Sequence, residues 1–455
     1  MIDHETELRG QLDRAAADVH APPDLLATVE RRIVVQRRQG ALIRVAGALV
    51  AAVLAAGVAL AVSGGGDDAE EVPVASDPTG TSAPATTLVP PDPPPLEQAG
   101  AWGTIATAPI PGRWQHVALD MDGEVLVWAG NGVEGSDGAL ERTDAAVYQT
   151  ATDTWREVPD APLYAGNVAA TWTGEVVIAV SINSNDGASP YEAASFDPAT
   201  DTWTPLAEPP TTLDQDGIPA LAWTGSHAVL LNSVGGLEQT AEVALYDPAT
   251  DTWTTGTTSP AGADFPTDPI WTGSEIVAVG SRPDDPTSID ATAVTAVILA
   301  YDPAADTWRE LPWELGPARR WDPAAAWTGT HLFVGGGLEP AGMRSDAALV
   351  DLDTGTWTPL PDAPAPFLGL LHGASAVWTG SQVVLLSDEQ GNLSGTPLAY
   401  EPATGGWSQG PALPGDPVPF GPAVWSADRI VVPAIGAADE YCCIPRPDGG
   451  LTYTP

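Results

Sequence analysis

A repeat of about fifty residues runs through most of this chain and constrains its fold more than any other feature. An inner-strand ending, most often Trp-Thr-Gly, recurs seven times, and seven further tryptophans follow the same period. The endings begin at Met121, Trp172, Trp223, Trp271, Trp327, Trp378 and Trp425, and the further tryptophans are Trp102, Trp155, Trp203, Trp253, Trp308, Trp357 and Trp407. Such a period is typical of a solenoid or a propeller.

Each unit has the pattern of four short strands separated by Gly, Asp and Pro. In the second unit these strands are predicted at 166–173, 175–180, 192–196 and 202–206. The turn between the last two strands is typified by Tyr-Asp-Pro-Ala-Thr-Asp-Thr-Trp, which starts at Tyr246. Pro suits the second position of a type I turn, and Asp and Thr bond nearby backbone groups there. We therefore expect these aspartates to shape turns rather than bind metal.

The two chain ends predict how the array closes. The last five residues, 451–455, match 398–402 but lack the tryptophan strand that should follow. A matching strand, 101–105, precedes the first complete unit. A last unit built from both ends leaves no unpaired sheet edge, which favours closure. The sequence therefore predicts an all-β, seven-bladed propeller closed by a shared blade.

The repeats resemble those of the kelch family, whose known fold is a β-propeller like the central domain of galactose oxidase. The resemblance is carried by an Arg at the start of inner strands, the Tyr-Asp-Pro-x-Thr-x-x-Trp turn and the Gly335-Gly336 pair, and it covers 100–455. The chain departs from the family at Val180-Ser181, Leu231-Asn232 and Leu386-Ser387, where a Gly pair is usual. The resemblance implies the fold but not the activity, because propellers carry many unrelated functions.

A different kind of sequence precedes the repeats. Eighteen consecutive residues, 45–62, have no polar side chain, and we predict a transmembrane helix over 41–63. Five arginines lie between residues 31 and 44, whereas four acidic residues follow the segment at 67–71. By the positive-inside rule the N-terminus is cytoplasmic and the propeller extracytoplasmic. A cleaved signal peptide is the alternative, although the apolar run exceeds the typical length of a signal core.

The remaining segments complete the predicted organisation. Residues 1–40 form a cytoplasmic stub with two short amphipathic helices, which resembles the inward segments of bacterial proteins related to anti-sigma factors. Residues 64–98 contain eight prolines and no aromatic residue, so they are predicted to form a disordered stalk. The propeller occupies 99–455. This arrangement is a membrane-anchored, single-pass bacterial form of a kelch-like protein.

The charge distribution supports the same partition. Residues 1–44 contain seven arginines and seven acidic residues, which leaves ten arginines against fifty-three acidic residues outside, so the external part accounts for the formal charge of −43. There is no lysine. So negative a surface disfavours nucleic acid as a partner. A salt-adapted or high-GC proteome, which replaces Lys with Arg and enriches acidic residues, explains this composition better than a specific basic partner does.

Two cysteines, Cys442 and Cys443, are adjacent and extracytoplasmic in the predicted topology. A bond between neighbours is strained, because adjacent Cα atoms are about 3.8 Å apart and ordinary disulfides need about 4.4 Å or more. An oxidising compartment can still form it. A vicinal disulfide and a reduced pair therefore both stay open.

Loop length points to a ligand site. The distance from the inner ending to the third-strand aromatic is 25, 22, 21, 28, 21, 20 and 26 residues in units one to seven, so extra length collects between strands two and three. Units seven and one are neighbours in a closed ring, and 437–449 with 131–143 are expected to form a raised wall, opposite 281–292. The candidate ligand contacts are Tyr441, Arg446, Glu141 and Arg142, because aromatic and arginine side chains often anchor interfaces.

No catalytic motif supports a reaction. The copper site that galactose oxidase uses needs tyrosines, histidines and a tyrosine joined to cysteine, and the external histidines, His116, His227, His331 and His372, are spread over four units. We predict no cofactor and no metal site. The sequence favours a binding or scaffold module for a protein or glycan ligand. The alternatives are a galactose oxidase-like or sugar-epimerase-like enzyme, and a sensor whose stub contacts a transcriptional regulator.

Overall fold

The computed structural model describes most of the repeat region. The described residues are 99–113, 116–133, 139–164, 167–182, 191–214, 217–234, 240–260, 268–283, 294–316, 320, 322–339, 342–367, 376–386, 396–413, 422–433 and 450–455. They belong to one compact unit, Leu96–Pro455. The stub, span and stalk that we predict from the sequence lie outside them. Within the described part of the chain, no helix has the length and apolar character needed to cross a bilayer.

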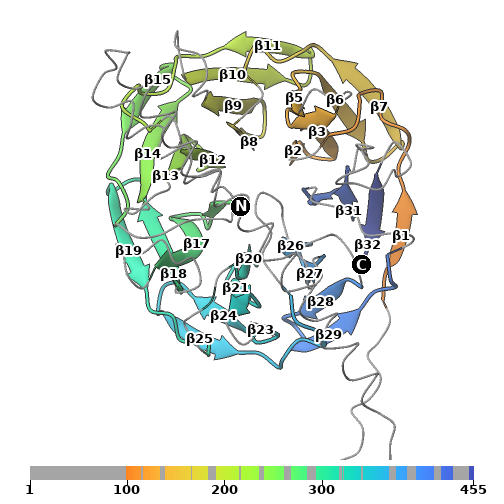
Figure 1. Ribbon diagram of the computed structural model, residues 1–455, viewed down its shortest axis with the longest axis vertical. Helices are drawn as coiled ribbons and strands as arrows, with labels where there is room; N and C mark the ends of the chain where they lie inside the picture. Colours follow the sequence, from red (N-terminus) through yellow and green to blue (C-terminus); the bar gives the residue numbers. More distant parts are fainter. Residues whose placement is uncertain are drawn as a thin grey trace, which may run out of the picture. The chain divides into compact units, whose positions relative to one another are not determined.

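Seven four-stranded antiparallel sheets, the blades, surround a central axis, with one strand of each near the axis and another at the circumference (Figure 1). This arrangement confirms the predicted all-β propeller of seven blades. From inner to outer strand, blade 1 contains β2 (Val117–Asp120), β3 (Glu124–Trp128), β6 (Ala145–Gln149) and β7 (Thr154–Val158), and blade 2 contains β8 (Asn167–Trp172), β9 (Val177–Ile182), β10 (Tyr191–Asp197) and β11 (Thr202–Pro205). The strands predicted for blade 2 agree to within two residues at each end.

The next four blades repeat this order. Blade 3 contains β12 (Ile218–Trp223), β13 (Ala228–Val234), β14 (Thr240–Asp247) and β15 (Thr252–Thr255), and blade 4 contains β16 (Ile270–Trp271), β17 (Ile276–Pro283), β18 (Val294–Asp302) and β19 (Thr307–Leu311). Blade 5 contains β20 (Ala324–Trp327), β21 (Leu332–Gly335), β24 (Ala347–Asp351) and β25 (Thr356–Pro359), and blade 6 contains β26 (Ala376–Trp378), β27 (Val383–Leu385), β28 (Leu398–Glu401) and β29 (Gly406–Gln409).

Blade 7 is built from both ends of the repeat region, as predicted. It contains β30 (Val424–Ser426), β31 (Arg429–Val432), β32 (Leu451–Thr454) and, as its outer strand, β1 (Ala101–Thr104). Strand β1 pairs antiparallel with β32, so that Trp102 lies opposite Tyr453. The Tyr453 hydroxyl also donates a hydrogen bond to the Ala99 carbonyl (3.1 Å). Non-covalent strand pairing therefore closes the ring.

The hydrophobic core is divided among the contacts between blades. One cluster joins Leu126 of blade 1 to Val177 of blade 2, and a second joins Val180 of blade 2 to Leu230 of blade 3. The middle strands are buried on both faces, because each blade packs between two neighbours; all six residues of β9 are buried. Such strands have continuous apolar runs rather than an alternating pattern. Each blade is therefore stabilised by both neighbours.

The outer-strand tryptophans link the blades through hydrogen bonds. In six blades the indole Nε1 donates to a backbone carbonyl in the segment that leaves the preceding blade. The donor and acceptor pairs are Trp102 and Pro411 (3.0 Å), Trp155 and Ala106 (2.8 Å), Trp203 and Pro159 (3.0 Å), Trp253 and Ala207 (2.8 Å), Trp308 and Thr257 (2.7 Å), and Trp407 and Pro361 (2.8 Å). We call this bond the indole bridge.

Blade 5 is the exception to the indole bridge. The Trp357 Nε1 is buried and has no hydrogen-bond partner among the described residues. Its ring instead packs edge-on against Trp313, with ring centroids 5.4 Å apart. Blade 5 also has Val350 where the other blades have Tyr or Phe opposite the tryptophan. Trp313 therefore supplies the aromatic neighbour that this blade lacks.

The aspartates of the repeated turns have the structural role predicted for them. In blade 3, Asp247 Oδ1 accepts a hydrogen bond from the Ala249 N–H (2.8 Å) and shapes the turn. Asp251 adopts a positive φ of 50°, which Asp tolerates better than most residues. Its carboxylate accepts bonds from the Tyr246 hydroxyl (2.9 Å) and from the Ala207 N–H (2.8 Å) of the preceding blade. The turn therefore also joins two blades.

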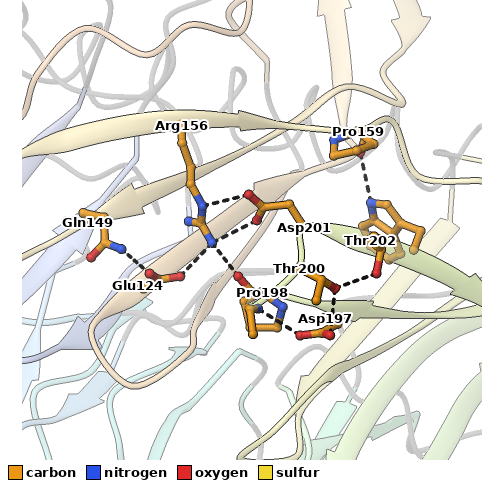
Figure 2. A network of polar contacts seen from close by, with 11 residues as sticks. Glu124, Gln149, Arg156, Pro159, Asp197, Pro198, Thr200, Asp201 and Thr202 are labelled. Carbon is orange, nitrogen blue, oxygen red and sulfur yellow. Dashed lines mark hydrogen bonds and ion pairs between the residues drawn. The ribbon is translucent and has the colours of Figure 1, made fainter.

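An ion-pair network provides a further link between blades 1 and 2 (Figure 2). Arg156 of β7 lies 2.9 Å from Glu124 Oε2 in its own blade and 3.1 Å from Asp201 Oδ1 in the next. It also donates to the Pro198 carbonyl (3.2 Å). Arg309 of blade 4 repeats this geometry, since it binds Glu275 of its own blade and the Leu352 carbonyl of blade 5 (3.1 Å).

The indole bridge can be tested with a matched pair of substitutions. We expect Trp253→Phe to lower the free energy of unfolding by about 0.5–1.5 kcal/mol more than Trp357→Phe does, because only Trp253 loses a hydrogen bond. Chemical denaturation measures both values. Equal losses would show that the bridge contributes nothing beyond ring packing.

Candidate functional site

The strand order gives the ring two distinct ends. In every blade the first strand turns into the second at one end, which we call the turn face, and in blades 1 to 6 the third strand turns into the fourth at the same end. The connections from the second to the third strand, and from each outer strand to the next blade, lie at the opposite end, the loop face. The turn face is uniform: the Trp-Thr-Gly turns of blades 2 to 6 share a bond from Thr N–H to the carbonyl three residues ahead, as in Thr173 to Val176 (3.0 Å).

Additional structure is found only on the loop face within the described part of the chain. Blade 1 carries a hairpin of β4 (Asn131–Val133) and β5 (Ala139–Glu141) between its second and third strands. Blade 5 carries a smaller hairpin of β22 (Leu338–Glu339) and β23 (Gly342–Met343) at the same place. In blade 4, β17 and β18 are themselves longer, at eight and nine residues.

Four blades place a carboxylate at one repeated position on this face. The position lies four residues before the third-strand residue that faces the outer tryptophan, and it is occupied by Asp144, Glu192, Glu242 and Asp346. We call these residues the rim carboxylates. Each one binds the segment that leads into the inner strand of its own blade. The contact is made either to the backbone of this segment or to an arginine that belongs to it. They therefore fix the entry of the chain into the ring centre.

In blade 1 the rim carboxylate Asp144 pairs with Arg113, whose side chain is fully buried. Arg113 also donates to the carbonyls of Ala129 (3.2 Å) and Asp144 (2.9 Å). Burial lowers the pKa of Arg113, and the neighbouring charge of Asp144 opposes that shift. The positive charge of Arg142 adds to the lowering, so the two guanidinium groups lie near each other at the base of the hairpin.

Blade 5 repeats this arrangement with additional partners. Arg320 donates to the Gly336 carbonyl (2.8 Å) and to both oxygens of Asp346 (3.2 and 2.9 Å). Arg344 also binds Asp346 (3.0 Å) and reaches Glu339 of the hairpin (3.1 Å). Burial alone would raise the pKa of Asp346, but the hydrogen bonds from the two arginines outweigh it and lower the pKa.

Trp313 completes the blade 5 cluster. Its ring lies 5.3 Å from the Arg320 guanidinium carbon, within the range of a cation–π contact. Its Nε1 donates to the Leu315 carbonyl (2.7 Å), to which Arg320 also donates (3.2 Å). This aromatic and charged cluster is held at several points, so its side chains are fixed in orientation.

In blades 2 and 3 the rim carboxylates accept hydrogen bonds from backbone and amide N–H groups. Glu192 accepts from the Tyr164 N–H (2.6 Å), and Glu242 accepts from the Asp214 N–H (2.7 Å) and from Asn232 Nδ2 (3.0 Å). The Asn232 side chain is fully buried, and its Oδ1 has no partner among the described residues. Burial and the charges of Glu242 and Asp214 raise the pKa of the neighbouring Tyr191 to about 12.

The predicted ligand contacts are only partly described. Glu141 is the last residue of β5, and Arg142 follows it, with its N–H bonded to the Gly130 carbonyl (3.0 Å) at the base of the hairpin. Tyr441, Arg446, Cys442 and Cys443 lie outside the described residues. The wall predicted between blades 7 and 1 therefore stays a prediction, and so does the state of the cysteines.

The described histidines do not converge on one place. His116 lies at the loop face next to the start of β2, whereas His227 and His331 immediately precede the second strands of blades 3 and 5 at the turn face. His372 lies outside the described residues. Among the described residues, no three His, Cys, Asp or Glu side chains gather closely enough to hold a metal ion. Copper favours nitrogen and sulfur donors, so the described residues do not fit a copper site.

The sequence pattern predicted an Arg at the start of inner strands, where Arg113 and Arg320 lie, but it did not predict the rim carboxylates, Trp313 or Arg344. One signal could have found the carboxylates: an acidic residue stands four positions before the third-strand site in four of the seven units. No comparable repeat marks Trp313 or Arg344. They occur in one blade only, so only the structure shows that they meet.

Comparison with known proteins supports the fold and does not assign an activity. No family model matches the chain, and no curated protein matches it. A solved structure described as a fungal alcohol oxidase of the AA5 family, in complex with copper, is similar with a TM-score of 0.53 and 16% sequence identity. The match covers 78% of this chain and 76% of that chain. At this identity the likeness shows the propeller fold alone, and the kelch assignment stays a prediction.

The blade 5 cluster provides a stability test. Asp346→Asn is expected to lower the free energy of unfolding by about 3–5 kcal/mol, because the fully buried Arg320 loses its carboxylate partner. Glu310→Gln is the control, since it breaks a partly exposed pair with Arg282 and should cost about 0–1 kcal/mol. Similar losses in the two variants would contradict a structural role for the rim carboxylate.

Proposed function

We propose that this chain is a membrane-anchored, extracytoplasmic binding or scaffold module that holds a protein or glycan ligand on its loop face. The observation that carries the proposal is the difference between the two faces. The turn face repeats one set of bonds from blade to blade, whereas the hairpins of blades 1 and 5 add structure to the loop face only. Loops on a rigid scaffold are a common location for binding residues.

The outer strand of blade 7 shows where the chain enters the ring. Strand β1 begins at Ala101, opposite Thr454, the last residue of the third strand, and it runs from the turn face toward the loop face. The chain therefore enters the ring at the turn face.

Side-chain chemistry supports ligand binding over nucleic-acid binding. The chain has a formal charge of −43, which repels nucleic-acid phosphates. The loop face nevertheless presents arginines at the hairpins of blades 1 and 5, Arg142 and Arg344, together with Trp313. Arginine and tryptophan are enriched among residues that dominate binding energy.

The binding proposal can be tested on the full chain in detergent, using a glycan array and cross-linking pull-downs from intact cells. Once a ligand is found, we expect Tyr441→Ala, Arg446→Ala and Arg142→Ala each to weaken binding about fivefold or more, corresponding to ~1 kcal/mol. Glu175→Ala on the turn face is the control and should bind normally. Undiminished binding by all three variants, with loss in the control, would place the ligand on the other face.

The proposed topology has its own test. External protease on intact cells should release an acidic fragment that begins within 64–98, while the stub stays protected by the membrane. Tags at residue 1 and residue 455 distinguish the two products by immunoblotting. Protection of the C-terminal tag, with digestion of the N-terminal one, would reverse the orientation.

An enzyme of the galactose oxidase kind is the second candidate, because the similar solved structure is described as an alcohol oxidase in complex with copper. Copper addition to the purified chain, followed by elemental analysis after desalting, tests copper binding without a substrate, and an oxidation assay with simple alcohols tests the activity. About one bound copper per chain, together with alcohol oxidation, would favour the enzyme over the binding module.

A further inference from the structure

The contact between blade 7 and blade 1, which we call the seam, differs from the other contacts between blades. It joins the blade made from both chain ends to the first complete blade, so it is the place where the ring can open. Thr150 of blade 1 and Ser426 of blade 7 share a buried hydrogen bond across it (2.7 Å). Strand pairing between β1 and β32 holds the shared blade together, with no covalent link in the described residues.

His116 lies at the loop end of this seam. The residue is 4% exposed, and neither ring nitrogen makes a well-formed hydrogen bond with the described residues, although the Pro433 carbonyl of blade 7 lies close enough to act on the ring. Native proteins rarely bury a polar group without a partner, so such a group calls for an explanation. By strand register the equivalent inner-strand positions in blades 2, 3 and 5 are Val168, Pro219 and Pro323, so the buried imidazole does not belong to the repeat pattern.

The surroundings of His116 disfavour a positive charge. Burial is the main cause that lowers its pKa to about 3, and the nearby charge of Arg113 adds to this effect. The Pro433 carbonyl of blade 7 acts in the opposite direction but does not offset them. Asp144 is engaged by Arg113. The closed seam therefore favours a neutral imidazole.

We infer that His116 is an acid-sensitive latch, whose protonation opens the seam between blades 7 and 1. A charged imidazole cannot stay desolvated beside Arg113, whereas an opened seam gives it water. Because the seam adjoins the blade 1 hairpin, opening it would also disassemble the proposed ligand wall. That last consequence rests on the proposed function, but the latch itself does not.

The direction and size of the effect follow from linkage. The pKa of the ring is lower in the closed state, so His116 supports closure above the pKa of the opened state, and this support is lost as the pH falls below it. With a ring pKa of about 3 when closed and about 6.5 when opened, acidification from pH 7 to pH 5 multiplies the ratio of opened to closed seam by about 25.

Protonation of a second ionisable group in the seam has the opposite effect on closure. Asp120, four residues further along β2, has a pKa raised chiefly by burial, with Ser426 and the Gly123 N–H as hydrogen-bond donors to its carboxylate and Asp122 as a nearby negative charge. Its protonation favours the closed seam as the pH falls. Asp120→Asn should therefore make the response to acid larger, not smaller.

Hydrogen exchange measured by mass spectrometry on the full chain at pH 7 and pH 5, corrected for intrinsic rates, tests the latch. In the wild type, peptides of β30, β31, β32 and β1 should lose at least tenfold in protection at pH 5 relative to those of blade 3. His116→Gln cannot titrate and should abolish this difference. His331→Gln removes a turn-face histidine and should leave it unchanged.

A direct titration keeps the test decisive if His116→Gln does not fold. The exchange of the histidine C2 proton in the wild type reports the pKa of each ring by mass spectrometry. A value for His116 below 4, with acid-dependent exchange in blade 7, supports the latch. A value near 6.5, or an identical response to acid in the wild type and His116→Gln, overturns it.

Discussion

The structure depends on closure of the ring by strands from its two ends. A propeller blade is buried on both faces, so an open ring would expose two apolar sheet faces and two unpaired edges. Pairing of β1 with β32 removes that exposure, and the bond from Trp102 to the Pro411 carbonyl joins the shared blade to blade 6. The other indole bridges repeat this link around the ring. Stability is therefore a collective property of the contacts between blades.

The two faces of the closed ring differ in their roles. The turn face has a structural role. Its aspartates shape the turns, and Asp251 and its equivalents bind the preceding blade. On the loop face the rim carboxylates hold the segments through which the chain enters the inner strands. The hairpins of blades 1 and 5 can therefore differ from each other without disturbing this anchoring. The arginines on this scaffold are few, and Arg113 and Arg320 are fully buried partners of rim carboxylates. The proposed binding function therefore depends on the hairpins and on residues outside the described ones.

The sequence predicted the ring well because its signals are local and repeated. The spacing of Tyr246 and Trp253, the turn between them and the unfinished last unit were sufficient for blade number and closure. The candidate site was less predictable, because its contacts join positions that the repeat does not relate. Arg344 and Arg320 both bind Asp346. Likewise, the burial of His116 depends on a blade assembled from the opposite end of the chain.

Cross-linking of the two strands that close the ring tests the account most directly. In a chain whose native cysteines are replaced by serine, cysteines at Gly103 and Thr452, which lie opposite each other in β1 and β32, should form a disulfide on mild oxidation. Cysteines at Gly103 and Tyr453, one residue out of register, should not. The account predicts a faster-migrating species on a non-reducing gel for the first pair only. Absence of that species, or equal cross-linking of both pairs, would contradict closure by a shared blade.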